Sequence, residues 1–361
     1  MSNETISGGK KLLYSPKRQL ELDIAKGLAV LCMIAVHVQS NLSKTEIIYS
    51  GFGGIIEFLG TLPAAPVFMF LLGTGAVYSR NNNLTKNIER GVKILILGYI
   101  LNILRTIIIF LPLIVSGEWK NQIDNIIPSL ITVDILQFAG LAIIFIGFIK
   151  KLELSIPKII ALAVAISSIN YIMISFQTKS YFLGAITGVL WGSSEWSSFP
   201  FITWIFYPLI GYCFGIVLKN AISKEDFYKK SLLYSVIILV SLIVVSIYFK
   251  IDSGLLTETS YAHHTLFNNF LYTSFVVAWI SCLYYISKIS PLYLNNMLAR
   301  WSKNVNSIYI IHWILISILI AVVGLNKLGF FVAMMAVTII CIASDMIAQN
   351  YKKMNLAIRK Q

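Results

Sequence analysis

This sequence has few charged residues. It also lacks the alternating segments that are typical of membrane β-barrels. Only 12% of the 361 residues are charged, while 57% are hydrophobic. Soluble domains carry about a quarter charged residues. Strictly alternating segments, which build a membrane β-barrel, are absent as well. The apolar residues instead arrive in runs of about 20, the length with which an α-helix crosses the hydrocarbon core. We therefore expect an all-α, polytopic integral membrane protein with about ten transmembrane helices.

The sequence also lacks the signatures of several common chemistries. Its four cysteines lie in apolar runs at no recurring spacing, a pattern that predicts packing side chains and neither disulfides nor zinc ligands. It has no P-loop, no dinucleotide-binding glycine pattern and no nucleophile-elbow motif. These absences disfavour phosphoryl transfer from ATP at a Walker site. We expect no metal and no bound cofactor.

Acidic residues are few, with 16 Asp and Glu against 29 Lys and Arg and a net charge of +13. With the N-terminus in the cytoplasm, 22 of the 29 basic residues fall in inside segments and five in outside ones, as the positive-inside rule requires. The excess therefore indicates topology and attraction to the lipid bilayer, and nucleic acid is not an expected partner. The predicted spans behind this count are residues 22–40, 59–79, 92–115, 127–149, 156–175, 198–218, 231–249, 266–287, 304–323 and 328–349.

The organisation of the chain follows from these spans. Residues 1–21 are predicted to be a basic cytoplasmic segment, 22–349 the transmembrane domain and 350–361 a basic cytoplasmic tail. Both termini are thus expected in the cytoplasm, with the protein in a bacterial cell (plasma) membrane. The longest outside connection, 176–197, holds an apolar piece too short to span, which predicts either a re-entrant or interfacial helix or a packed loop. No internal repeat typical of secondary transporters is evident.

The first predicted span carries the most polar residues, and ionisable groups inside spans are candidates for function. At about 100° per residue, Asp23, Lys26, Gly27 and His37 fall on one broad face. Lys26 and His37 are separated by roughly 16 Å along the helix axis. Structural alternatives stay open, because Asp23 can pair with Lys26 at the helix start, Lys26 can extend to the headgroups, and His37 can be a hydrogen-bonded interfacial residue.

The third and fourth spans contribute a second polar set. Asn102 and Arg105 lie one turn apart, as do Asp134 and Gln137 on the next span. An Arg105–Asp134 bridge inside the bundle is one interpretation, and a ligand-facing role for Arg105 or Gln137 is the other. His312 lies about two turns into the ninth span, where a packed imidazole and a ligand-binding one are both compatible with its position.

Several of these residues also carry a family resemblance. The stretch Arg18-x-x-x-x-Asp23-x-x-Lys26-Gly27, followed by His37, resembles the opening of the transmembrane acyltransferase superfamily. The order of further similar segments favours its heparan-α-glucosaminide N-acetyltransferase-like branch, which is related to acyltransferase family three. Those segments, which extend the resemblance to about residue 320, are 65–73, 134–140, 199–204 with Gly211 and Gly215, and 307–312.

Two of the departures from the family pattern bear on the proposed chemistry. Lys26 stands where the family usually has arginine, which keeps the charge but loses the fork that grips phosphate at two points. The loop from Val38 to Gly51 has no histidine, whereas the animal lysosomal enzymes carry theirs in this loop. His37 therefore becomes the candidate base, at the position that the family-three branch uses.

The resemblance implies an acyltransferase that moves an acyl group, usually acetyl, from cytoplasmic acyl-CoA to a sugar or glycan acceptor on the far side. Acetyl-CoA is then the donor substrate, and a homodimer is compatible with this interpretation. His37 would be the catalytic base, with Asp23 orienting Lys26. The alternative is a transporter or flippase for a lipid-linked sugar or small solute, which would use the same buried charges. The residues expected to bind acyl-CoA are Lys26, Gly27, Lys93, Asn102, Arg105, Gln137 and His312.

Overall fold

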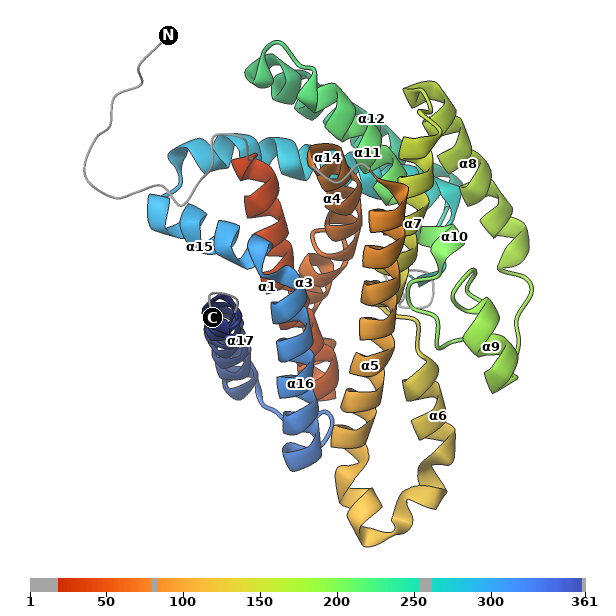
Figure 1. Cartoon of the computed structure of the whole chain (residues 1–361), viewed down its shortest axis with the longest axis vertical. Coiled ribbons are helices and arrows are strands. Elements are labelled where there is room, and N and C mark those ends of the chain that lie inside the picture. The colour runs from red at the N-terminus through yellow and green to blue at the C-terminus, as the bar shows by residue number, and fades with distance from the viewer. Residues whose placement is uncertain (1–18, 80–82, 253–261, 359–361) are drawn as a thin grey trace.

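The computed structural model describes residues 19–79, 83–252 and 262–358. Within these ranges the regular structure is helical, with two isolated β-bridges and no strand, so the predicted all-α fold is confirmed (Figure 1). Arg18 and most of the predicted N-terminal segment lie outside the described residues, as do residues 359–361 of the predicted tail.

In the part of the chain that the structure describes, eight stretches are long and apolar enough to cross a membrane, and each matches one predicted span. The prediction of a polytopic membrane protein is therefore confirmed. Two of the eight are formed by consecutive helices, α3 with α4 and α10 with α11. The elements are α3 (Gly51–Thr61), α4 (Ala65–Tyr78), α5 (Leu84–Ser116), α8 (Ile156–Met173), α10 (Phe201–Trp204), α11 (Phe206–Lys219), α12 (Lys224–Phe249), α14 (Leu266–Ile289), α16 (Val305–Val323) and α17 (Phe330–Ile358).

The other two predicted spans are not among these eight stretches. The first is α1 (Leu20–Leu42), whose sequence is interrupted by polar residues. The span predicted at 127–149 is broken into α6 (Ile123–Ile131) and α7 (Ile135–Lys151). The break has a local cause, because Asp134 caps α7: its Oδ1 accepts from the Ile135 N–H at 2.7 Å, and Gln137 completes a capping box.

Helix α1 runs through the middle of the bundle, in contact with α3, α4, α14, α15, α16 and α17. Around it, α5 packs along α7 and α4 along α11, and glycines allow both pairs to approach closely. A Cβ atom at Gly91 would collide with the Gly140 carbonyl, and one at Gly73 with the Pro208 carbonyl. The glycines of the resembling segments thus serve helix packing, as small residues commonly do in membranes.

Two connections contain structure that the sequence did not make obvious. An inside loop was expected near residue 300, but α15 (Leu292–Lys303) forms there and packs on α1. In the long outside connection, α9 (Tyr181–Thr187) is followed by a loop bound to Val133, whose N–H donates to the Trp196 carbonyl at 3.0 Å. The apolar piece thus begins as a short helix and continues into a loop that packs on the bundle. The short elements α2 (Thr45–Ile48) and η1 (Glu118–Gln122) complete the fold.

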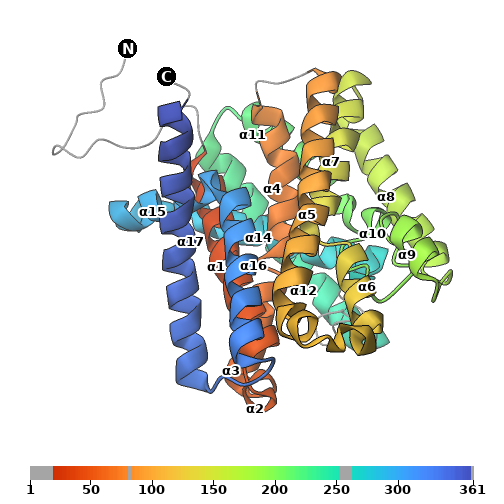
Figure 2. The ribbon, with the colours of Figure 1, turned by 60° about the horizontal axis from the view of Figure 1, so that its bottom comes forward.

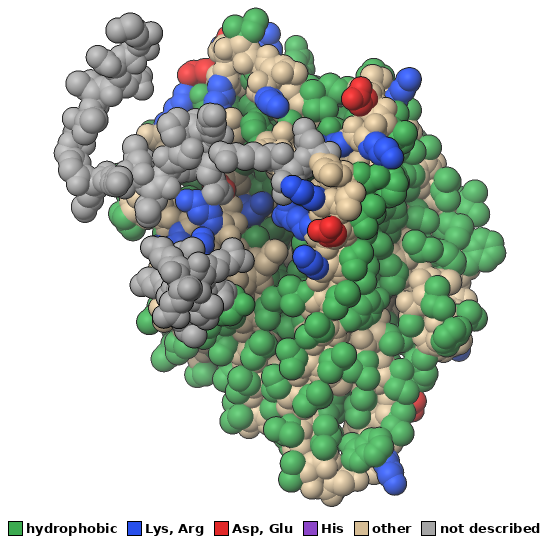
Figure 3. All heavy atoms as spheres, viewed as in Figure 1, with side chains coloured by type: hydrophobic (Ala, Val, Ile, Leu, Met, Phe, Trp, Pro, Cys, Tyr) green, Lys and Arg blue, Asp and Glu red, His purple; other side chains and the backbone are tan. Residues whose placement is uncertain are grey.

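The helix ends that were predicted to be cytoplasmic gather at one end of the molecule (Figure 2). In the space-filling view, Lys and Arg side chains cluster at that end around a hollow, whereas hydrophobic side chains cover most of the remaining visible face (Figure 3). This division matches a protein whose middle faces lipid and whose basic rim faces headgroups and solvent.

Candidate functional site

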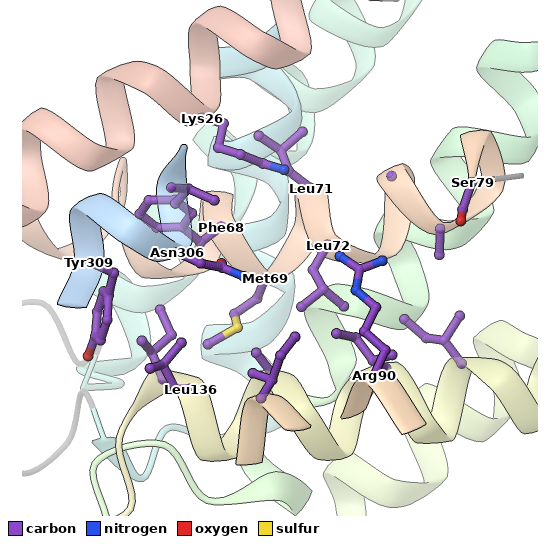
Figure 4. A pocket seen from close by; sticks show the side chains of 18 of the residues that line it. Lys26, Phe68, Met69, Leu71, Leu72, Ser79, Arg90, Leu136, Asn306 and Tyr309 are labelled. Carbon is purple, nitrogen blue, oxygen red and sulfur yellow. The ribbon is translucent and has the colours of Figure 1, made fainter. Parts of the chain in front are cut away.

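A cavity of about 300 Å³ opens among α1, α4, α5, α7 and α16 (Figure 4). Its polar lining lies near helix ends of the basic side: Lys26 in α1, Ser79 after α4, Arg90 early in α5 and Lys150 in the last turn of α7. The Lys150 Nζ donates to the Ala76 carbonyl at 2.6 Å. Three cations therefore surround the outer part of the cavity, where they can bind an anionic group.

The inner part of the cavity is apolar and long. It extends along α7 from Lys150 to Leu136, a distance of roughly 21 Å at the rise of an α-helix. Figure 4 shows Lys26 entering from α1 and Arg90 from α5, with Tyr309 at the far end. The inner lining consists mainly of Met33, Phe68, Met69, Leu71, Leu72, Ile94, Ile135, Leu136, Ala139, Ile143 and Ile146.

Beyond Tyr309 lies a cluster of aromatic rings and histidines. Tyr309 lines the cavity and packs edge-on against His312 with ring centroids 5.2 Å apart. His312 stacks on His37 at 5.6 Å, and His37 lies 4.3 Å from the ring of Trp313. The structure thus joins His37 of α1 to His312 of α16, which the sequence placed in separate candidate sets.

His312 is buried in one defined tautomer. Its Nδ1 lies 3.1 Å from the Ile308 carbonyl, and since a carbonyl only accepts, Nδ1 carries the hydrogen and Nε2 the free lone pair. Nε2 has no hydrogen-bond partner among the described residues. A buried polar atom without a partner is costly, and a bound water, a ligand or a role in a reaction is a usual reason for one.

Arg105 completes this cluster from α5. Its Nη1 lies 3.2 Å from Asp134 Oδ2, and its guanidinium carbon lies 3.5 Å from the centroid of the Trp313 ring. The Arg105–Asp134 pair predicted from the sequence is therefore confirmed. The two side chains are 20% and 14% exposed, so the pair remains accessible to a small molecule.

Several predicted acyl-CoA-binding residues do not line the cavity. Asn102 and Gln137 are buried, and both side chains donate to the Thr132 carbonyl, at 2.7 and 3.4 Å. They hold the break between α6 and α7, because its carbonyls have no partner in a regular helix. Lys93 is exposed and absent from the cavity lining, since it lies about 60° around α5 from Arg90.

Gly27 and Asp23 also face away from the cavity. A side chain at Gly27 would collide with the Leu298 carbonyl of α15, and Gly27 lies about 100° around α1 from Lys26. Asp23 accepts a hydrogen bond from Ser302 of α15 at 2.6 Å. It lies roughly 21 Å along the axis from His37, so the two side chains do not share one reacting centre.

Sequence reasoning missed four residues of the site. Arg90 and Lys150 were assigned only to the basic rim, although Arg90 lies in the run of α5 that faces α7. Tyr309 was quoted only as part of a resembling segment, and Trp313 was not considered. The available signal was that Tyr309, His312 and Trp313 recur at helical spacing on one side of α16.

Part of the chain matches a known protein family. The family model described as heparan-alpha-glucosaminide N-acetyltransferase, catalytic, matches residues 18–250. No curated protein matches the chain. The matched region contains Lys26, His37, Arg90, Arg105 and Lys150, and it ends before α16 with Tyr309, His312 and Trp313.

Proposed function

Since the chain belongs to the heparan-alpha-glucosaminide N-acetyltransferase catalytic family, we propose that it transfers an acetyl group from cytoplasmic acetyl-CoA to a sugar or glycan on the other side of the membrane. The observation that carries this proposal is the form of the cavity, which begins between three cations and ends at Tyr309 beside the two histidines. A donor with phosphates at one end and a reactive thioester at the other fits that division.

The outer part of the cavity supports binding of the CoA phosphates. Lys26, Arg90 and Lys150 come from three different helices, and cationic side chains form short, charge-assisted hydrogen bonds with phosphate oxygens. Arg90 supplies a guanidinium fork, which Lys26 lacks. The apolar inner part suits the long pantetheine arm, which would place the thioester near Tyr309.

The position of the cavity supports entry of the donor from the cytoplasm. Its cations lie at the basic end of the molecule, which the positive-inside rule assigns to the cytoplasm. His37 lies three turns further along α1 than Lys26, and it returns to within about 20° of the same direction around the helix. A thioester bound from one side and an acceptor arriving from the other would meet near His37.

In the proposed reaction, the neutral His37 imidazole takes the proton from the attacking hydroxyl or amine of the acceptor. The acceptor oxygen or nitrogen bonds to the acyl carbon, and the carbon–sulfur bond breaks. The proton held by His37 then passes to the departing CoA thiolate. Atoms and charge balance without a covalent enzyme intermediate.

Two measurements test this function. Acetyl-CoA should raise the Tm of the purified protein in detergent, because a ligand that binds only the folded state stabilises it by mass action. Inside-out membrane vesicles should transfer label from acetyl-CoA to envelope glycans, and sealed right-side-out vesicles should not. Labelling of both vesicle types to the same extent would contradict the sidedness. A transporter or flippase would show neither the stabilisation nor the transfer.

A further inference from the structure

Arg105 leaves most of its hydrogen-bonding capacity unused. A guanidinium group carries five N–H donors, and in Arg105 only Nη1 is engaged, at 3.2 Å from Asp134 Oδ2. Its Nε and Nη2 groups make no hydrogen bond with the residues that the structure describes. Arg105 is nevertheless held in place, because Asp134 anchors one side of the group and Trp313 lies beneath its plane.

The same Trp313 ring also packs against the imidazole ring of His37. The guanidinium carbon lies 3.5 Å from the ring centroid, and the imidazole centroid lies 4.3 Å from it. The two groups are therefore no further apart than these two distances combined. In acyl transfer, a base binds the attacking atom, the attacking atom approaches the carbonyl carbon, and a hydrogen-bond donor binds the carbonyl oxygen. These groups follow one another along a bent line. With hydrogen bonds of about 2.8 Å at each end, the length of such a line is comparable to the greatest separation that these two contacts allow between His37 and Arg105.

We propose that Arg105 donates hydrogen bonds to the carbonyl oxygen of the acyl group during transfer, with Asp134 and Trp313 as the residues that position it. This inference rests on the proposed acetyl transfer. When the acceptor atom bonds to the acyl carbon, the carbonyl oxygen becomes negatively charged, and the Arg105 cation stabilises that charge. When the carbon–sulfur bond breaks, the carbonyl re-forms and the proton on His37 passes to the CoA thiolate.

The position of Arg105 argues against the role that the sequence suggested, which was binding of acyl-CoA phosphates. Arg105 lies roughly 22 Å along α5 from Arg90, and only Arg90 of these two lines the cavity. A donor aimed at charge that develops in the transition state changes kcat, whereas a phosphate ligand changes the affinity for CoA.

The test uses the full-length protein with labelled acetyl-CoA and inside-out vesicles that contain the native glycans. In Arg105→Gln, kcat should fall by about 10²–10³, as for loss of an oxyanion donor, while acetyl-CoA should raise the Tm as much as in the wild type. Arg105→Lys keeps the charge without the fork and should lose less. The matched control is Arg300→Gln, which removes another paired arginine outside the cavity and should keep transfer per folded molecule.

Three results would overturn the inference. Normal transfer by folded Arg105→Gln would show that no oxyanion donor was removed, and loss of the acetyl-CoA-induced Tm shift would make Arg105 a CoA ligand instead. If Arg105→Gln does not fold, Arg105→Lys decides, and full activity in that variant would exclude a need for the fork. Failure of the wild type to transfer acetyl or to be stabilised by acetyl-CoA would refute the proposed function itself, which distinguishes the two failures.

Discussion

Among the residues that the structure describes, two arginine–aspartate pairs join helices, and they are built differently. Arg300 of α15 binds Asp345 of α17 through Nε at 3.1 and 3.2 Å and through Nη2 at 2.6 Å. Arg105 of α5 makes one 3.2 Å hydrogen bond to Asp134 and stacks on Trp313. A bidentate pair uses its donors to hold two helices together. The looser pair keeps donors available, beside two histidines and a cavity.

The comparison shows that a buried or half-buried ion pair has no single meaning in a membrane protein. Both pairs reduce the cost of charge within or near the bilayer. What distinguishes a structural ion pair from a candidate reaction centre is the number of N–H donors that already make hydrogen bonds and the groups that lie nearby. The sequence offered no such distinction, because both pairs consist of the same two residue types.

The largest expected effect concerns the histidine beside the Arg105 pair. His37→Gln keeps the approximate size and hydrogen bonding but cannot accept a proton at neutral pH. Transfer should fall by roughly 10²–10⁴, while the protein still folds and acetyl-CoA still raises its Tm. Transfer in inside-out vesicles and thermal unfolding in detergent measure the two effects. Near-normal turnover by the folded variant would remove His37 from the mechanism and make His312 the next residue to test.

The Arg300 pair should respond to substitution in stability alone. Arg300→Ala leaves Asp345, which is 10% exposed, without its bidentate partner, and should lower the unfolding free energy by about 1–3 kcal/mol. The double change with Asp345→Ala should recover part of that loss, because no charge is then stranded. Denaturation in detergent and transfer per folded molecule are the measurements. A double variant less stable than either single variant would show that the two residues do not act as a pair.

Arg90 and Lys93 lie one turn apart on α5, and their substitutions should differ in their effect on the affinity for acetyl-CoA. Arg90→Gln should weaken acetyl-CoA binding about tenfold, the equivalent of roughly 1.4 kcal/mol, because Arg90 lines the cavity. Lys93→Gln should leave the affinity unchanged, because Lys93 does not line the cavity. Titration of the acetyl-CoA-induced Tm shift gives both values. Equal weakening by the two substitutions would indicate that general positive charge, and not a defined ligand, binds the donor.

The smallest effect tests the double role of Asp134, which both pairs with Arg105 and caps α7. Asp134→Asn retains a good capping side chain and loses the charge, whereas Asp134→Ala loses both. The alanine variant should be less stable than the asparagine variant by about 1 kcal/mol. Asp345 of the other pair lies in the interior of α17. It does not cap a helix, so the advantage of asparagine over alanine as a cap is not expected at that position. Equal stability of the two Asp134 variants would mean that the cap contributes nothing.

The helical class, most spans and the basic end could be predicted because they depend on local physics. The length of apolar runs and the distribution of Lys and Arg act through the bilayer and need no tertiary contact. The Arg105–Asp134 pair could also be predicted, since an unpaired charge inside a span is costly. The break in the span predicted at 127–149 was missed, although Asp134 with Gln137 is a capping signal that apolar periodicity outweighed.

The candidate site was predicted only in part, because residues on one broad helix face can point toward different partners. Lys26 and Gly27 are adjacent in sequence, yet one lines the cavity and the other receives α15. Their directions differ by about 100°, an angle that periodicity alone does not assign to a particular neighbour. Asn102 and Gln137 were similarly polar within apolar runs, but the turn at Thr132 uses both side chains.

The sequence by itself determined that this chain is a helical membrane protein with a basic side and a polar first helix, because hydrophobicity and charge act at each position independently. Tertiary structure alone decided that His37, Trp313 and Arg105 stack together at the end of a cavity lined by Arg90 and Tyr309. These residues come from three helices, and their meeting depends on the rotation and crossing of each helix. Packing sets that geometry through contacts between segments far apart in the chain.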